Sequence, residues 1–266
     1  MSVPIALVRG VNDVASAVAL ELARHGLAVL MVEAPAPAVP RRGQSFADAA
    51  FDGEARLEGE TARLTAEPLS WAEQARAGEI ALTLQAVDDF APALAPAVWI
   101  DARMRKRALP EDQRGRAPRV IGLGPNFVAG GNVDLAIETA WGDTLGAVIE
   151  AGPTSAFGGE PKPIGGYGRE RYVYAPAAGV FHTTYRIGQA VAAGEIVAHL
   201  DGQPIPAPKP GILRGLTHDG VRIKPGTKCV EVVPEGTPVF GVGARPAAIA
   251  AGVIAALRRR GFPPAA

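Results

Sequence analysis

The sequence predicts an α/β protein in which a parallel sheet is followed by a small all-β unit and a C-terminal helix. Residues 4–33 have the order strand, glycine turn, helix and strand, which is the pattern of a βαβ unit with two parallel strands. Residues 175–200 and 207–232 match one another without a gap at an offset of 32, as expected of a duplicated β unit. Residues 246–261 have the apolar-sided, alanine-rich pattern of a helix.

The other elements follow from the same periodicities. Buried strands are predicted in VPIALVRG and LAVLMVE, and the helix between them in DVASAVALELARHG. Further parallel strands are predicted at 80–84, 97–101 and 119–123. Residues 45–64 alternate polar and apolar side chains around Asp52-Gly53 and Glu58-Gly59, which predicts short strands joined by tight turns. Finally, a short helix is predicted at 132–142 and a strand at 145–152.

These elements divide the chain into four parts. We predict a Rossmann-like, nucleotide-binding domain at 1–152, a glycine- and proline-rich connection at 153–170, a β domain at 171–234, and a segment at 235–266 whose helix packs back on the body. The connection fits a plain linker and a functional loop equally well.

The composition excludes several classes of protein. The 27 basic residues balance 27 acidic residues without a long basic run, which argues against a nucleic-acid-binding surface. A single cysteine, Cys229, excludes an internal disulfide framework, and the four scattered histidines have no metal-ligand spacing, so no metal site is expected. No apolar stretch reaches 18 residues and no leader pattern is present, so we expect a cytoplasmic protein that does not span a membrane.

The first candidate site is the turn between the first strand and helix. Gly10 is followed by Asn12, which stands at the second glycine position of a dinucleotide fingerprint. A helix N-terminus at such a turn can hold a phosphate, Arg9 and Asp13 add polar groups to its rim, and Glu33 ends the second strand where an acid can bind a ribose. The alternative is a turn that only packs, with Asp13 as the helix N-cap.

A second candidate is the glycine-rich loop after the strand at 119–123. Gly122 lies at the end of this strand, and Gly124, Pro125 and Asn126 follow it. Parallel sheets bind ligands beyond the carboxyl ends of their strands. We therefore expect this loop and the Gly10 turn to face one crevice. The alternative is a plain strand-to-helix connection with Asp134 as the capping residue.

A third candidate lies after the strand at 97–101. Asp101 is followed closely by Arg103, Arg105, Lys106 and Arg107, a set that can bind an anionic ligand or form an acid–base pair. Asp101 and Lys106 are the candidates for catalysis. The alternative is a solvated loop with surface ion pairs.

Five stretches together resemble the selenium-dependent molybdenum hydroxylase system accessory family. They read RGVNDVASAV, RRGQSFADAAFDGEARLEGETARL, VIGLGPNFVAGGNVDLAIET, IGGYGRERYVYAP and the repeat, in the family's order, over about residues 4–257. This chain has Asn12 where the family usually has glycine, and Trp141, Gly142 and Asp143 where it usually has RGH. The resemblance implies a role in maturing a molybdenum hydroxylase, with that enzyme or its maturation factors as partners.

The repeat separately resembles a barrel-sandwich hybrid module of the biotinyl/lipoyl type, which is built from two equivalent halves. Carrier modules of this type bear a modified lysine on the hairpin that joins the halves. Here the joining segment is LDGQPIP at 200–206, which has no lysine, and Lys209 comes only later. We therefore predict no biotin or lipoyl attachment.

The leading functional hypothesis is an accessory protein that binds a nucleotide-bearing cofactor in the α/β crevice, with a nucleotide, NAD(P) or a molybdopterin dinucleotide as candidate ligands. One alternative is an NAD(P)-dependent oxidoreductase, which the incomplete fingerprint at Asn12 disfavours. Another is a non-catalytic interaction protein. Homo-oligomerisation and the reaction, if any, are left open by the sequence.

Overall fold

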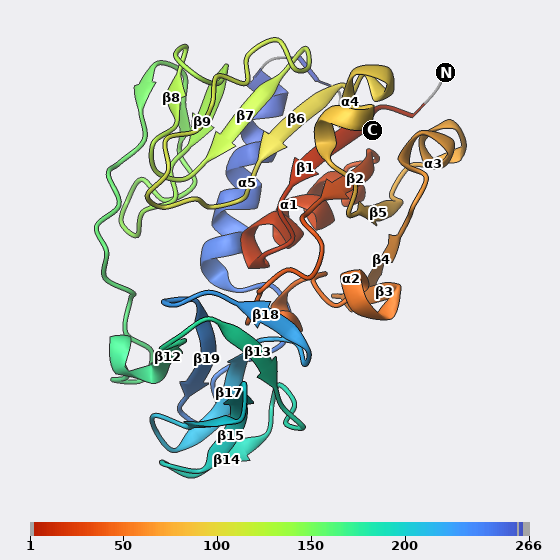
Figure 1. Cartoon of the computed structure of the whole chain (residues 1–266). Helices are drawn as coiled ribbons and strands as arrows, with labels where there is room; N and C mark the ends of the chain where they lie inside the picture. Colours follow the sequence, from red (N-terminus) through yellow and green to blue (C-terminus); the bar gives the residue numbers. More distant parts are fainter. Residues whose placement is uncertain (1–2, 260, 263–266) are drawn as a thin grey trace.

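The computed structural model describes residues 3–259 and 261–262. These form a mixed α/β body built on a large sheet, and a β module at residues 172–233 that lies beyond one end of this sheet (Figure 1). The chain then returns to the body as helix α5 (Ala244–Arg259). The last residues of the predicted segment 235–266, and residue 260 of the predicted helix, lie outside the described residues.

The body contains a nine-stranded sheet with the order β10-β9-β7-β6-β1-β2-β5-β4-β3. Its strands are parallel except for β3 and β10, which lie antiparallel at the two edges. Their bounds are β1 (Ile5–Arg9), β2 (Ala28–Val32), β3 (Glu54–Leu57), β4 (Glu60–Leu64), β5 (Ile80–Thr83), β6 (Val98–Asp101), β7 (Val120–Leu123), β9 (Leu135–Ile137) and β10 (Val148–Ile149). Two short strands, β8 (Val128–Ala129) and β11 (Gly152–Pro153), pair beside it.

Helices cover both faces of this sheet. Helix α1 (Asp13–Arg24) and α5 pack together over one face in a core of aliphatic side chains. Helices α3 (Pro68–Gln74) and α4 (Val87–Leu94) lie over the other face, around the buried Trp99. Gly252 of α5 has to be glycine, since a Cβ there would lie 2.2 Å from the carbonyl oxygen of Gly146. Two short elements, η1 (Arg42–Gln44) and α2 (Ala49–Asp52), lead from β2 towards β3.

Most predicted elements of the body are confirmed. The βαβ unit is β1-α1-β2, and the strands predicted at 80–84, 97–101 and 119–123 are β5, β6 and β7. The Glu58-Gly59 turn joins β3 to β4, with both residues at positive φ. The Asp52-Gly53 pair instead ends helix α2.

The prediction of a helix at 132–142 is wrong. Its apolar residues form strand β9, which pairs in parallel with β7 and is fully buried. Burial on both faces makes such a strand a continuous apolar run, which periodicity cannot distinguish from a helix segment. Asp134 caps no helix, because its carboxylate accepts the N–H of Val120 at 2.8 Å. The strand predicted at 145–152 is shorter than expected, since β10 covers only Val148–Ile149 and Gly152 begins β11.

The β module consists of two four-stranded antiparallel sheets with the orders β12-β19-β17-β14 and β16-β15-β13-β18. Strands β13, β14 and β15 come from the first repeat, and β17, β18 and β19 from the second, each pair about 32 residues apart. The bounds are β12 (Tyr172–Tyr174), β13 (Gly179–His182), β14 (Ala190–Val191), β15 (Ile196–Leu200), β16 (Gln203–Pro206), β17 (Gly211–Leu216), β18 (Val221–Ile223) and β19 (Lys228–Val233).

Reciprocal hydrogen bonds relate the two repeats. The N–H of Gly188 donates to the carbonyl of Leu213, and the N–H of Gly220 donates to that of Phe181, both at 2.8 Å. Each donor and each acceptor is 32 residues from its counterpart. The duplicated sequence therefore folds into two equivalent halves that exchange one strand each, since β14 pairs with β17 and β18 pairs with β13.

No helix in the described part of the chain is long and apolar enough to cross a lipid bilayer.

Candidate functional site

The carboxyl ends of β1, β2, β6 and β7 meet at the same edge of the sheet, because these strands are neighbours and parallel. The turn after β1 depends on Gly10, which has a φ of 112°. A Cβ at this position would lie 3.0 Å from the carbonyl oxygen of Ala102, at the end of β6. Gly10 therefore allows two strand ends to approach closely, and this alone explains the glycine.

Asn12 is the N-cap of helix α1. Its Oδ1 accepts the N–H groups of Val14 at 3.0 Å and Ala15 at 3.1 Å, and its Nδ2 donates to the carbonyl of Ala102 at 2.8 Å. The alternative with Asp13 as the cap is therefore wrong. Asn12 has an extended backbone with a φ of −67°, so the position needs no left-handed conformation. The cap occupies two of the N–H groups that a phosphate at this helix end would use.

The acid at the end of β2 lies close to the turn. Glu33 accepts the N–H of Ala34 at 2.8 Å. Burial raises the pKa of its carboxyl group, because the effect of burial is larger than the opposing effect of its hydrogen bonds. Arg9 donates to Glu111 at 2.7 Å, and its guanidinium lies 5.5 Å from the centroid of the Trp99 ring. Arg9 and Glu33 therefore lie at the predicted edge of the sheet, but both are already hydrogen-bonded to other groups of the protein.

Asp101 is buried in a network of hydrogen bonds. Its carboxylate pairs with Arg103, accepts the Nε2 of Gln113 at 2.7 Å, and lies 3.5 Å from Arg105. Burial opposes its ionisation, but the bond to Arg103 and the charge of that residue lower its pKa. Gln113 also accepts the indole N–H of Trp99. With a side chain 1% exposed, Asp101 holds the loop after β6 in place and has no open path to a ligand.

The Gly122–Asn126 loop is also explained by packing. A Cβ on Gly122 would lie 2.3 Å from the ring of Phe127, so the residue is needed for that contact. Gly124 has a φ of 107°, and Pro125 is buried. Asn126, with a φ of 72°, donates from Nδ2 to the carbonyl of Ala108 at 3.2 Å. The loop therefore supports the segment that carries Lys106.

The strongest side-chain cluster lies between the body and the β module, and the sequence analysis found only two of its members, Asp13 and Lys106. Arg41, from the segment after β2, donates to Asp13 at 2.8 Å and from Nε to Glu231 of β19 at 2.8 Å. The same segment accepts a backbone hydrogen bond from the module, because the N–H of Leu216 donates to the carbonyl of Pro40. A chain of ion pairs thus connects the N-terminus of α1 to the module.

Glu231 is the centre of this cluster. Its carboxylate is fully buried and accepts hydrogen bonds from Arg41, from Arg171 at 3.0 Å and from Arg214 at 3.2 Å. Burial opposes ionisation, but the charge and hydrogen bonds of Arg41, followed by those of Arg214 and Arg171, lower the pKa of Glu231 to about 2. The carboxylate is therefore ionised at neutral pH, with its oxygens occupied by guanidinium groups.

Two β-bulges direct side chains to this cluster. In the pairing of β19 with β12, Cys229 has no partner residue on the neighbouring strand. In the pairing of β17 with β19, Arg214 has none. A bulge of this kind turns successive side chains towards the same face, so Lys228 and Glu231 lie together although they are three residues apart. Gly215 stands opposite Glu231, where a Cβ would lie 2.8 Å from the Cβ of Glu231.

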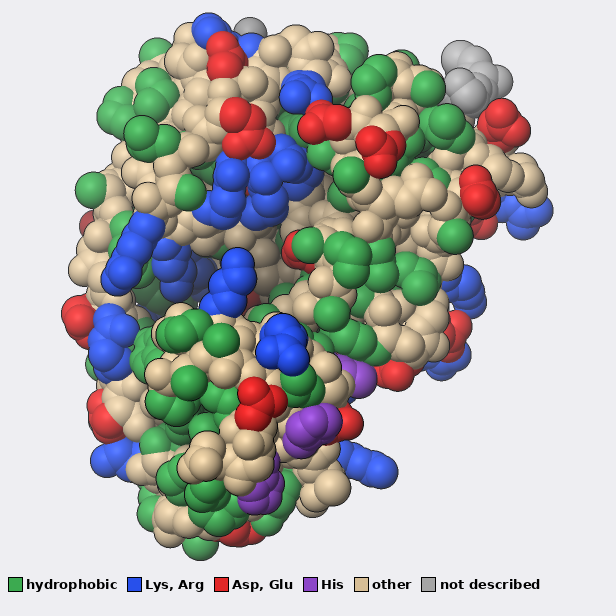
Figure 2. Space-filling view, in the orientation of Figure 1, with side chains coloured by type: hydrophobic (Ala, Val, Ile, Leu, Met, Phe, Trp, Pro, Cys, Tyr) green, Lys and Arg blue, Asp and Glu red, His purple; other side chains and the backbone are tan. Residues whose placement is uncertain are grey.

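Further cations complete the cluster. Burial, and then the charges of Arg245 and Arg41, lower the pKa of Lys106. Burial and the charge of Arg41, with a smaller effect of Lys106, lower the pKa of Lys228. We name the site the basic hollow. It contains the cations Arg41, Lys106, Arg171, Arg214, Lys228 and Arg245, and the carboxylates Asp13 and Glu231. Figure 2 shows Lys and Arg side chains gathered around a hollow between the body and the module.

The basic hollow has an excess of positive charge, because its six cations face the two carboxylates Asp13 and Glu231, and Glu138 is the one further carboxylate that acts on Arg245 among the described residues. The Nε of Arg214 is buried and has no hydrogen-bond partner among the described residues. Burial, and then the charge of Arg41, lowers the pKa of Arg214. Buried cations that lower one another's pKa are stabilised when an anion binds among them. The arrangement is therefore suited to an anionic ligand.

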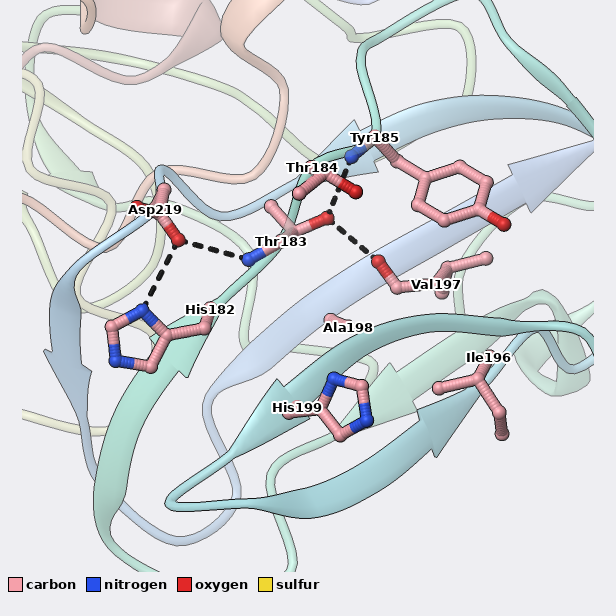
Figure 3. A pocket seen from close by; sticks show the side chains of 9 residues that line it. All are labelled: His182, Thr183, Thr184, Tyr185, Ile196, Val197, Ala198, His199 and Asp219. Carbon is pink, nitrogen blue, oxygen red and sulfur yellow. Dashed lines mark hydrogen bonds and ion pairs between the residues drawn. The ribbon is translucent and has the colours of Figure 1, made fainter.

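A separate pocket of about 370 Å³ is lined by residues of the module (Figure 3). His182 and His199 are cross-strand neighbours on β13 and β15, and the Nδ1 of His182 lies 3.2 Å from Asp219. Ile196 and Thr183 also contribute to its lining. In residues 3–259 and 261–262, no group of three or more His, Cys, Asp or Glu is placed to hold a metal ion.

The repeat contains a signal that could have located the basic hollow. Arg214, Lys228 and Glu231 of the second copy stand 32 residues after His182, Ile196 and His199 of the first copy. At these three positions the second copy has Arg, Lys or Glu where the first copy has histidine or isoleucine. Both copies form the same strands, so the fold does not require these charged residues. The difference therefore points to a ligand or an interface.

The comparisons with known proteins establish no function for this chain. No protein-family model matches the chain. It is 36% identical over 253 residues to the "Uncharacterized protein YqeB" of Escherichia coli (strain K12), which covers 94% of this chain and 47% of that protein. The chain thus spans about half the length of this curated relative.

Three solved structures share a weak likeness to the chain. A succinylglutamate desuccinylase/aspartoacylase from Rhodobacter sphaeroides is 20% identical, over 57% of this chain and 62% of that one, with a TM-score of 0.23. The ectoine utilization protein EutE (DoeB) from Ruegeria pomeroyi is 12% identical in its product-bound form, over 86% and 52%, and 14% identical in its apo form, over 88% and 86%. The TM-scores are 0.23 and 0.26, which support no conclusion about this chain.

Proposed function

We propose that the chain is a cytoplasmic accessory protein for the maturation of a molybdenum hydroxylase, and that it binds a phosphate-bearing, nucleotide-type ligand in the basic hollow. The pathway rests on the sequence resemblance, and the ligand class rests on the charge of the hollow. The proposal includes a Rossmann-like fold for the body at 1–152 and a barrel-sandwich hybrid fold for the module at 171–234.

The excess of cations in the basic hollow carries the ligand proposal. Arg41 and Arg171 already hold Glu231, whereas Lys106, Lys228 and Arg245 have no carboxylate within ion-pair distance among the described residues. Arg245 donates only to the carbonyl of Thr139. Phosphate groups are the common ligands of such convergent Arg and Lys side chains.

The NAD(P)-dependent oxidoreductase is the weaker candidate. A dinucleotide bound in the usual way needs free N–H groups at the start of α1, and Asn12 already binds those of Val14 and Ala15. The carboxylate of Asp101 is enclosed by Arg103 and Gln113. We therefore place the proposed ligand between the body and the module, with Asp13 and Lys106 at its edge, and not on the Gly10 turn.

Calorimetric titration with CTP, GTP, NAD(H) and NADP(H) tests the ligand class. We expect a nucleotide to bind, and to bind about tenfold more weakly to each of Lys106→Gln and Arg245→Gln, since each loses one charge contact. Lys224→Gln, on the exposed turn between β18 and β19, is the matched control and should bind as the wild type does. Binding of the nicotinamide forms alone, unchanged by these substitutions, would favour the oxidoreductase.

Deletion of the gene in its host tests the pathway. We expect the molybdenum hydroxylase to be produced with an incomplete cofactor and little activity. A fully active hydroxylase with a complete cofactor would contradict the proposed role. Failure of every nucleotide to bind, together with co-purification with a hydroxylase subunit, would favour a non-catalytic interaction protein.

A further inference from the structure

Lys228, like Lys106 and Arg245, has no carboxylate within ion-pair distance among the described residues. It is half-buried at the start of β19, and its Nζ lies 3.4 Å from the centroid of the Tyr172 ring. The carboxylate of Glu231 is near, but its oxygens are bound by Arg41, Arg171 and Arg214. The amine is therefore surrounded by cations and an aromatic face.

This environment favours the neutral amine. Burial removes water from the ammonium group, and the charges of Arg41, Lys106 and Arg171 repel it more than Glu231 attracts it. The pKa of Lys228 is lowered to about 7, so a substantial share of the side chain carries a free lone pair at neutral pH. Desolvated lysines beside other cations are nucleophilic for the same reason.

We propose that Lys228 is a nucleophilic amine that forms an imine with a carbonyl-bearing anionic ligand seated in the basic hollow. The amine nitrogen attacks the carbonyl carbon, the C=O π bond opens to a carbinolamine, and the oxygen leaves as water with both protons of the neutral amine. No oxidant or reductant is required. The inference rests on the proposed function, because the surrounding cations are what hold the anionic part of the ligand beside the amine.

The neighbouring thiol and phenol groups do not compete for this role. The Cys229 thiol is buried on the far face of the bulge, and burial raises its pKa to about 11. The Tyr172 hydroxyl is bound by Arg171 and Arg41, and burial, with the charge of Glu231, raises its pKa. At neutral pH both groups stay protonated, whereas Lys228 is poised to react.

Labelling with pyridoxal 5′-phosphate tests this inference, because this probe combines an aldehyde with a phosphate. The full chain is mixed with a limiting amount of the probe, reduced with borohydride and mapped by mass spectrometry. We expect Lys228 to be labelled at least about tenfold faster than Lys162, Lys209 or Lys224. The rate should fall about tenfold from pH 8 to pH 6, following the free-amine fraction of a group that titrates near 7.

Two variants serve as controls. Lys228→Arg keeps the charge and removes the nucleophile, so it should abolish the fast labelling. Ile196→Lys places an amine at the equivalent position of the other repeat, next to the matching bulge but away from the cations. The introduced amine should be labelled no faster than Lys224, and pyridoxal without the phosphate should label Lys228 slowly.

The outcomes separate the two proposals. If phosphate binds calorimetrically but Lys228 is labelled no faster than Lys224, the nucleophile is overturned and the anion site stands. If Lys228 is labelled quickly, but excess phosphate does not protect it and Arg245→Gln does not slow it, the amine is reactive and the anion site fails. Equal labelling of Ile196→Lys and Lys228 would show that the cations contribute nothing.

Discussion

The two halves of the β module have the same frame and different surfaces. Cys229 of the second half and Val197 of the first are skipped in the registers of β19 and β15, so both halves have a bulge at the same place. In the second half, the residues around the bulge include Arg214, Lys228 and Glu231, which face the body. In the first half, their counterparts are His182, Ile196 and His199, which line an open pocket.

This difference separates what the fold needs from what a ligand needs. The bulge and the reciprocal glycine hydrogen bonds occur in both halves, so they belong to the frame. The charges of Arg214, Lys228 and Glu231 occur only in the second half, where the module meets Arg41 and the carboxyl edge of the sheet. The buried ion pairs of the module are therefore concentrated on one half of a duplicated unit, at its contact with the body.

The largest expected effect comes from Glu231→Gln. Removing this buried negative charge leaves three guanidinium groups facing one another, which should lower the free energy of unfolding by about 3–5 kcal/mol. His199→Gln, at the equivalent position of the first half, should change it by less than about 0.5 kcal/mol. Urea unfolding at pH 7 measures both, and equal effects would remove the distinction between the halves.

The same carboxylate predicts a pH dependence. The folded pKa of Glu231, about 2, lies below its unfolded value, so its contribution to stability is complete above the unfolded pKa and is lost as the pH falls towards 2. Unfolding curves measured between pH 6 and pH 3 should therefore show the wild type losing stability, and Glu231→Gln losing less. Parallel losses in the two proteins would assign the acid sensitivity to other groups.

A smaller effect is expected for Gly215→Ala. The added methyl group would lie 2.8 Å from the Cβ of Glu231 and 3.4 Å from that of Pro40, so we expect a loss of about 1–3 kcal/mol from overpacking. The first half has Thr183 at this position, and its hydroxyl donates to the carbonyl of Val197 at 2.6 Å. Thr183→Ala should cost about 1 kcal/mol. A neutral Gly215→Ala would mean that the junction is loosely packed.

The pH dependence of anion binding tests the charge of Lys228. Binding of inorganic phosphate should strengthen by up to about tenfold from pH 8 to pH 6, since the amine gains its charge as the pH falls through about 7, after allowance for the titration of phosphate itself. An arginine is charged throughout this pH range, so phosphate binding by Lys228→Arg should not show this part of the pH dependence. An unchanged slope would place the titrating group elsewhere.

The smallest effect is expected for His182→Gln in the open pocket. Both His182 and Asp219 are more than half exposed, so the contact between them contributes little. Stability should change by less than about 0.5 kcal/mol and phosphate affinity should not change. Weaker phosphate binding by this variant would show that the pocket, and not only the basic hollow, receives anions.

Much of the frame is predictable from sequence because it depends on local periodicity and on repetition. The β1-α1-β2 unit and the two-half module follow from these signals, whereas β9 was predicted as a helix because a short buried run carries no period. The candidate site is less predictable. Asp13 and Arg41 are 28 residues apart, and Arg41 and Glu231 are 190 residues apart. Only tertiary packing brings them together, while Gly10, Asn12 and Gly122 are explained by local geometry.

A crystal structure of the protein with inorganic pyrophosphate would test the central claim most directly. The account predicts density for the anion in the basic hollow, within hydrogen-bond distance of Lys228 and of Lys106 or Arg245, with Glu231 still held by its three arginines. Pyrophosphate bound instead at the Gly10 turn, with Asn12 displaced from the N–H groups of Val14 and Ala15, would contradict it.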